Sequence, residues 1–351
     1  MKDSNKVLVI GGGGREHAII HKLKESDKVS KIYCAPGNGG ITRDAECVPI
    51  GVMEFDRLVD FAKSNEIDMV MVAPDDPLVA GAVDAFENAG IRAFGPNKRA
   101  AIIEGSKAFS KDLMKKYNIP TAKYEVFSNS VEAIGYIKEQ DTYPIVVKAD
   151  GLALGKGVII AETFEDAEKA VHEIMDDKVF GSAGGKVVIE EFLTGPEISV
   201  LAFTDGKTIK PMVSAQDHKR AFDNDKGPNT GGMGTFSPSR IYTDELADEC
   251  MKNIFIPTMN AMNSENRTFK GVLYFGLMKT PDGVKVIEYN CRFGDPETQV
   301  VLPRLESDLF EIFDAVIDER LNEIDIKWND GAAVCVVLAS GGYPRKYQTG
   351  Y

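Results

Sequence analysis

Two side chains that carry oxygen atoms follow an apolar segment near residue 290. The stretch VKVIEYNCRFGDPETQ (284–299) begins as a buried strand and then places Glu288 and Asn290 two positions apart. Because residues i and i+2 of a strand share a face, a carboxylate and an amide oxygen point the same way. Mg²⁺ prefers such ligands and usually completes its shell with substrate phosphates. Arg292 follows with the same parity and suits a phosphate or carboxylate, although an ordinary strand with a polar face would share this spacing.

A second candidate for anion binding is the glycine run Gly11 to Gly14. It follows the apolar segment KVLVI (6–10) and precedes a helix expected from about Arg15. Glycines allow a close approach of the backbone, and free N–H groups at a helix start attract anions. The third glycine of a dinucleotide fingerprint would fall at Glu16 or His17, so the spacing favours a single phosphate or a mononucleotide over NAD.

The first hundred residues alternate between apolar segments and helical patterns. Such alternation predicts a doubly wound parallel sheet that binds ligands at the carboxyl ends of its strands. The loops there read GGGGREH, APGNGG and APDDP, which fits backbone contacts to a phosphate or ribose, although tight turns alone would also explain them. The predicted strands are 6–10, 31–37, 67–74 and 91–96, and the predicted helices start at about 15 and span 55–64 and 77–88.

Two lysines and a glycine loop mark the middle of the chain. Lys107 falls in the first turn of a helix predicted over 104–117, where the helix dipole disfavours a cation unless an anion is bound. Lys148 ends a strand, and the loop GLALGKG (151–157) joins that strand to the next. A P-loop leads into a helix, so this loop differs from one, but it can fold over a triphosphate as a flap.

A polar, glycine-rich segment covers residues 214–238. Its weak periodicity predicts a long loop, and loops of this length are usually functional or disordered. Four consecutive charged or polar side chains, Asp217 to Arg220, favour a charged substrate, although a helix or strand face would explain one or two of them. Asn229 and the amides of 230–234 could form a nest for an anion.

Bulk composition describes a globular chain of 351 residues, enough for roughly two or three domains. No apolar run approaches the ~20 residues of a membrane helix, and the N-terminus lacks the cleavage pattern of a signal peptide. The net charge of −13 argues against nucleic acid as a partner. Five scattered cysteines favour reduced thiols and a cytoplasmic location; they are Cys34, Cys47, Cys250, Cys291 and Cys335.

The motifs together resemble the ATP-grasp superfamily. The two lysines, the loop GLALGKG, and the segments EEFLTGPE and IEYN occur in its order over about residues 107–299. Within it, the chain is similar to the glycinamide ribonucleotide synthetase (phosphoribosylamine–glycine ligase) family, and the matching segments span nearly the whole chain. They are GGGGREHA, APGN, FGP with EGSKAF, KADGLALGKGV, SAQDHKR, GPNTGGMG and NCRFGDPETQ.

The resemblance implies an α/β fold in which a doubly wound parallel sheet precedes an α+β ATP-grasp domain. The expected divisions are a Rossmann-like domain at 1–105, an ATP-grasp domain at 106–325 with a small lid at about 122–192, and the start of a C-terminal domain at 326–351. Because the family continues further, we expect this last domain to be truncated.

The resemblance also implies roles for single residues. Glu190 would accept from the adenine amino group, the backbone of Glu191 and Leu193 would flank the base, and Glu197 would hold the ribose. The implied ATP-binding set is Lys107, Lys148, Gly155, Lys156, Gly157, Glu190, Glu191, Leu193 and Glu197. The implied substrate-binding set is Gly13, Arg15, Glu16, Asn38, Asp217, Lys219, Asn229, Gly231, Gly232, Arg292 and Asp295.

Catalysis would rest on Lys148 and Arg292, and Glu288 and Asn290 would ligate Mg²⁺, with Mn²⁺ as a possible substitute. Many ATP-grasp enzymes place another metal-binding carboxylate on the preceding strand. Here that strand, GVLYFGLMK (271–279), has none, and Phe275 or Gly276 occupies the position. This departure argues against a second metal that is ligated entirely by the protein.

The reaction expected from the resemblance joins glycine to 5-phosphoribosylamine at the expense of ATP, through glycyl phosphate, in purine biosynthesis. The expected protein is a monomer or weak homodimer. Alternatives are another ATP-grasp carboxylate–amine ligase, a biotin-dependent carboxylase, and an inactive ATP-binding form. A Rossmann dehydrogenase is disfavoured by the glycine spacing.

Overall fold

The N-terminal part is a five-stranded parallel sheet. The computed structural model describes residues 4–153, 157–224 and 226–350. Strands β1 (Asn5–Gly11), β2 (Val29–Pro36), β3 (Glu46–Cys47), β4 (Met69–Val72) and β5 (Ala93–Phe94) follow the order β3-β2-β1-β4-β5. All four strand pairs are parallel, which confirms the doubly wound sheet.

Helices cover both faces of this sheet because its strands are apolar on both sides. Val7 and Val9 of β1 belong to one core with Leu23 of α1 (Gly14–Leu23). Leu8 and Ile10 belong to another core with residues of α2 (Phe55–Ser64) and α4 (Ala82–Asn88). The carboxyl end of β1 is thereby fixed, and the glycine run follows it directly.

Two predicted helix boundaries are wrong. The helix predicted over 77–88 consists of α3 (Asp75–Ala80) and α4, because Gly81, at a φ of +104°, ends the first and precedes the second. The helix predicted from residue 104 begins at Lys107. Glu104 lies in the last turn of α5 (Lys98–Gly105), and extended Ser106 caps α6 (Lys107–Lys116) by accepting a hydrogen bond from the Phe109 N–H.

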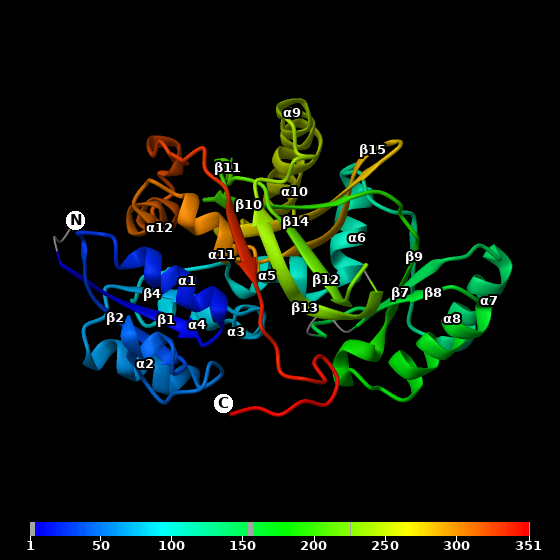
Figure 1. Cartoon of the computed structure of the whole chain (residues 1–351), viewed down its shortest axis with the longest axis horizontal. Coiled ribbons are helices and arrows are strands. Elements are labelled where there is room, and N and C mark those ends of the chain that lie inside the picture. Colours follow the sequence, from blue (N-terminus) through cyan, green and yellow to red (C-terminus); the bar gives the residue numbers. More distant parts are fainter. Residues whose placement is uncertain (1–3, 154–156, 225, 351) are drawn as a thin grey trace.

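A four-stranded antiparallel sheet, here called the lid sheet, lies at the far end of the molecule from β1 (Figure 1). Its order is β6 (Tyr124–Phe127), β9 (Val187–Glu191), β7 (Ile145–Ala149) and β8 (Val158–Ala161). Helices α7 (Ser130–Gln140) and α8 (Phe164–Val171) pack on it. The antiparallel pairing of β7 with β8 confirms the predicted strand–loop–strand, while residues 154–156 of the loop lie outside the described residues.

A second antiparallel sheet lies between these two parts (Figure 1). Its order is β11 (Ile209–Pro211), β10 (Glu197–Thr204), β14 (Gly271–Thr280) and β15 (Gly283–Asn290). One face packs on α9 (Asp244–Cys250) and α10 (Ile256–Ser264), and the other on α12 (Leu309–Ile317). Helix α11 (Thr298–Val301) follows β15. Shorter helical turns are Ile41–Arg43, His172–Asp176, Gly181–Gly185, Met251–Phe255, Leu302–Arg304 and Leu321–Glu323.

The segment 214–238 is not the loop that its composition suggested. It forms the hairpin β12 (Gln216–Phe222) and β13 (Lys226–Ser237), and β16 (Ala333–Val336) extends this sheet. Most residues of β12 and the first half of β13 are partly exposed, so no apolar face produced the alternation that indicates a strand. Residues 230–234 lie within β13, where the register with β12 is irregular, and the anion nest expected from Asn229 and these amides stays a prediction.

Among the described residues, no helix combines the length and apolar character required to cross a membrane. The divisions at residues 105 and 325, the lid limits and the expected truncation stay predictions.

The left-handed backbone of Gly81 generates a stability prediction. An added Cβ would meet the Lys98 side chain at 3.4 Å, an ordinary contact, so Gly81→Ala is expected to cost about 1–2 kcal/mol from backbone strain alone. The control is Gly135→Ala in α7, which has open space at its Cβ and should stabilise by roughly 0.5–1 kcal/mol. Urea unfolding measures both free energies, and equal effects of the two changes would contradict the assignment.

Candidate active site

A cavity of about 1180 Å³ opens between the lid sheet, the β12–β13 hairpin and the end of β15. Most of the predicted site residues line it, although they come from segments far apart in the chain. They are Lys107, Lys148, Gly157, Glu190, Glu191, Leu193, Glu197, Asp217, Lys219, Asn229, Gly231, Glu288, Asn290, Arg292 and Asp295. Gly155 and Lys156 lie outside the described residues.

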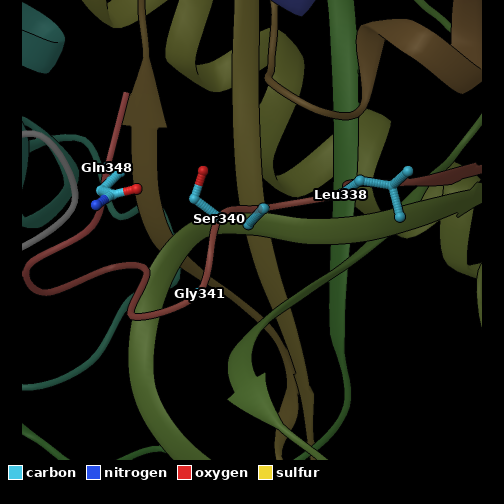
Figure 2. A pocket seen from close by; sticks show the side chains of 5 residues that line it. Leu338, Ser340, Gly341 and Gln348 are labelled. Carbon is cyan, nitrogen blue, oxygen red and sulfur yellow. The ribbon is translucent and has the colours of Figure 1, made fainter. Parts of the chain in front are cut away.

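Another hollow lies beside the C-terminal segment (Figure 2). Its volume is about 620 Å³, and its lining is Leu338, Ala339, Ser340, Gly341 and Gln348. None of these five residues has a side chain that titrates in the physiological range or carries a charge, so this hollow offers no side chain for acid–base chemistry.

The predicted residues of the N-terminal loops form a neighbouring group. Glu16 accepts from the Gly13 N–H (2.5 Å) and from Arg15 Nε (2.7 Å). Arg15 also donates to the Phe293 carbonyl (3.2 Å), and Asn38 donates to the Gly12 carbonyl (2.8 Å).

These contacts place the glycine run against the segment that follows β15. A Cβ added at Gly13 would lie 3.5 Å from Asp295 Oδ2, and one at Gly232 would collide with Pro296 at 2.4 Å. The two substrate-binding groups predicted from distant segments are therefore adjacent around residues 293–296.

Glu288 and Asn290 stand at the end of β15, as the strand parity predicted. A bulge at Ile287 interrupts the pairing with β14 and leaves Glu288 opposite Gly276. A Cβ at Gly276 would approach the Glu288 side chain to 3.1 Å, so the partner strand offers neither a carboxylate nor room for one. Within the described residues, no group of three or more His, Cys, Asp or Glu could hold a metal. A cation here would therefore need phosphate or water oxygens as further ligands.

Cations surround Glu288 and keep it ionised. Burial favours the neutral carboxyl, but the neighbouring positive charges, with Lys219 the strongest, outweigh it and hold the pKa of Glu288 below its ordinary value. The other contributors are Lys148, Lys107 and Arg292. An ionised carboxylate beside an amide oxygen fits a hard divalent cation.

Glu104 is a buried site residue that sequence reasoning missed. It accepts from Asn290 Nδ2 (2.8 Å) and the Cys291 N–H (2.7 Å), and it pairs with Arg292 Nη2 (3.1 Å). Arg292 also donates to the Phe293 carbonyl, while its buried Nε has no hydrogen-bond partner among the described residues. In the sequence, Glu104 read only as the start of a helix.

Lys111 is a second residue that was missed. Its ammonium lies 2.8 Å from Glu190 Oε2, and Lys148 lies 2.9 Å from Glu190 Oε1, so two lysines hold one buried carboxylate. Burial lowers the pKa of Lys111 to about 8 against the attraction of Glu190. The helical spacing of Lys107 and Lys111, i and i+4, was the signal that could have found it.

The remaining predicted ATP residues differ in what they contact. Lys107 donates to the Gly151 carbonyl (2.9 Å) at the base of the glycine loop, and burial lowers its pKa. The Glu191 side chain accepts from the Lys123 N–H and from Lys285, and its backbone N–H donates to the Lys123 carbonyl. Glu197 pairs with Lys219 (3.4 Å).

Lys219 of the hairpin lies near Glu197 and Glu288 of other elements as well as near Asp217 of its own strand. Its ammonium lies 3.8 Å from Asp217 and 3.9 Å from Glu288. Burial raises the pKa of Asp217 to about 6, although Lys219 opposes this. Behind Asp217, buried Glu297 accepts from Ser199 (3.0 Å) and Tyr274 (3.1 Å). The hairpin thus presents the Lys219 cation beside the Asp217 carboxyl group, whose pKa is raised to about 6.

Comparisons with known proteins match nearly the whole chain. Family models of phosphoribosylglycinamide synthetase match, with the N domain at residues 5–104 and the ATP-grasp (A) domain at 105–298. The phosphoribosylamine–glycine ligase of Halalkalibacterium halodurans is 53% identical over 98% of this chain and 80% of its own length. That of Clostridium acetobutylicum is 50% identical over 99% and 83%.

Solved structures give the same result for the fold. The phosphoribosylamine–glycine ligase of Thermotoga maritima superposes with a TM-score of 0.83 at 32% identity, covering 98% of this chain and 82% of that one. The biotin carboxylase domain of the Hydrogenobacter thermophilus 2-oxoglutarate carboxylase, solved with MgADP and bicarbonate, has a TM-score of 0.71 at 18% identity, covering 94% and 73%. At that identity the second match shows the fold alone.

The raised pKa of Asp217 predicts a pH-dependent stability. Its folded pKa of about 6 exceeds the ordinary value of 3.8, so the folded protein holds a proton that the unfolded chain has lost, and stability falls as the pH rises from about 4 to 6. Asparagine does not titrate, so Asp217→Asn removes this loss of stability at rising pH. The stability of the variant relative to the unmodified protein should therefore rise by about 1 kcal/mol between pH 5 and pH 7.

Urea unfolding at the two pH values measures this difference. A control is Asp282→Asn, at the exposed turn between β14 and β15, whose relative stability should not change between the two pH values. A constant difference for Asp217→Asn would contradict the raised pKa.

Proposed function

The chain belongs to the phosphoribosylglycinamide synthetase family, and we propose that the cavity described above joins glycine to 5-phosphoribosylamine through the residues assigned below. It is an ATP-grasp ligase, and the reaction of the family yields glycinamide ribonucleotide, ADP and phosphate. The observation that carries the assignment is the convergence of three lysines and Arg292 around the ionised Glu288.

The chemistry requires this charge arrangement. The carboxylate of glycine is a poor acyl donor because its leaving group would be oxide, so ATP must first convert it into glycyl phosphate. That step brings an anionic carboxylate to an anionic phosphate. Lys148 and Arg292 would lower the repulsion and hold the reacting groups in line.

A divalent cation on Glu288 and Asn290 would supply further charge neutralisation for the phosphates. The family binds ATP with a divalent metal, and the oxygen donors at β15 suit Mg²⁺, with Mn²⁺ as a substitute. The chain's part is to keep Glu288 ionised and to present the Asn290 amide at the same strand end.

ATP would lie against the lid sheet. Lys107 and Lys148 would contact its phosphates, the loop 151–157 would cover them, and the backbone around residues 191–193 would flank the adenine. A closed loop would also shield glycyl phosphate from water. Glu190, which lies between Lys111 and Lys148, would accept from the adenine amino group, and Glu197 would hold the ribose.

The two substrates would meet at residues 293–296. The carboxyl groups of Asp217 and Asp295 suit the glycine ammonium, and the glycine run before α1 suits the ribose phosphate, since free N–H groups at a helix start attract anions. The remaining contributors would be Arg15, Glu16, Asn38, Lys219, Asn229, Gly231 and Gly232. The expected oligomeric state, monomer or weak homodimer, stays a prediction.

Release of ADP from ATP, Mg²⁺ and glycine, with and without freshly made phosphoribosylamine, tests the proposal. We expect release only when both substrates are present. Glu288→Ala removes a charged ligand and should lower kcat/KM at least about 100-fold. Asp282→Ala, at the other end of the same strand pair, is the matched control and should leave kcat/KM unchanged.

Two results would count against the proposal. Equal ADP release with another carboxylate or amine would indicate a different ATP-grasp ligase. Full activity of Glu288→Ala would remove Glu288 from the metal site.

A further inference from the structure

One buried carboxylate collects N–H donors from three consecutive residues. Glu104 is 7% exposed and lies in the last turn of helix α5, whereas its donors are the last residue of β15 and the two residues that follow it. Oε1 receives Asn290 Nδ2 at 2.8 Å and Arg292 Nη2 at 3.1 Å, and Oε2 receives the Cys291 N–H at 2.7 Å. A single side chain from the N-terminal part therefore binds the end of the strand that carries the proposed metal ligands, through hydrogen bonds and an ion pair.

The donors determine which way the Asn290 amide faces. A guanidinium and a backbone N–H can only donate, so both oxygens of Glu104 are acceptors in this arrangement. An asparagine amide has a donor side and an acceptor side, and the donor side must face an acceptor. Nδ2 is thereby committed to Glu104, and Oδ1 is the atom left to serve a cation.

We propose that Glu104 is a positioning residue that orients the Asn290 amide, so that its oxygen and not its nitrogen is presented beside Glu288. This inference rests on the proposed function, because it assumes a divalent cation at Glu288 and Asn290. A rotated amide would offer two N–H groups to a cation, and the site would lose one of its two protein ligands. The same carboxylate also pairs with Arg292, so Glu104 holds both the Asn290 amide and the Arg292 guanidinium in place.

The alternative is that Glu104 only stabilises the fold as a buried partner of Arg292. Both roles predict a loss of stability when Glu104 is changed, so stability cannot separate them. Metal affinity can, because loss of a group that orients a metal ligand typically weakens binding 10–100-fold.

The test is direct Mn²⁺ binding by electron paramagnetic resonance, with a non-hydrolysable ATP analogue present. Glu104→Gln keeps the shape but replaces one acceptor oxygen by a donor, and we expect the Mn²⁺ dissociation constant to rise about 10–100-fold. The matched control is Asp314→Asn. Asp314 is also a buried carboxylate held by arginines, Arg92 (2.7 Å) and Arg320 (3.1 Å), but it lies in α12 outside the cavity. This control should bind Mn²⁺ as the unmodified protein does.

A double-mutant cycle shows whether Glu104 acts through Asn290. In an Asn290→Ala background the amide is gone, so Glu104→Gln should change the dissociation constant less than about twofold. An undiminished loss in that background, or unmodified affinity in Glu104→Gln alone, overturns the proposal. If Glu104→Gln does not fold, Glu104→Asp, which withdraws the oxygens by one methylene, is measured instead, with weakened binding expected and unmodified affinity overturning the proposal.

The outcome is separable from that of the proposed function. Mn²⁺ binding is read without turnover, so an unmodified protein that binds Mn²⁺ but releases no ADP would refute the ligase assignment alone. Normal turnover with unchanged Mn²⁺ affinity in Glu104→Gln would refute only the role of Glu104.

Discussion

Repulsion between anions is the constraint on which the site depends. In the proposed reaction a carboxylate, a triphosphate and a ribose phosphate would share one cavity, in a chain whose net charge is −13. The structure meets this by drawing cations from separate elements, with Lys107 from α6, Lys148 from β7 and Lys219 from β12. Each cation would be costly to bury alone. Glu190, Glu288 and Asp217 compensate these positive charges, so an anionic ligand would enter the cavity by replacing contacts between these side chains.

That balance explains why the fold needs three sheets around one cavity. The antiparallel sheet that ends with β15 supplies Glu288 and Asn290. The lid sheet supplies Lys148 and Glu190, and the hairpin supplies Asp217 and Lys219. The parallel sheet contributes through the segments that follow its strands, since Asn38 donates to the Gly12 carbonyl of the glycine run and Arg15 donates to the Phe293 carbonyl after β15. Helix α5 adds Glu104, which ties the N-terminal part to β15 directly.

Sequence patterns predicted those elements whose own residues carry the signal. Helix α2 was placed at 55–64 because its apolar stripe is periodic, and β1 because it is buried on both faces. The β12–β13 hairpin was not predicted, because its partly exposed strands show no alternation of apolar and polar residues. Glu104 was missed for another reason, since its role exists only through partners distant in the chain, such as Asn290, 186 positions away. No local pattern encodes such a contact.

Arg292 shows how the long-range contacts refine what the motif alone implies. The spacing of Glu288, Asn290 and Arg292 suggested three groups that independently face a ligand. In the structure Arg292 already pairs with Glu104, and only its buried Nε is without a partner among the described residues. A guanidinium held in this way cannot swing freely to follow a phosphate, but it needs little reorganisation once charge develops beside it. The same carboxylate that commits the Asn290 nitrogen therefore also limits Arg292 to electrostatic support from a fixed position.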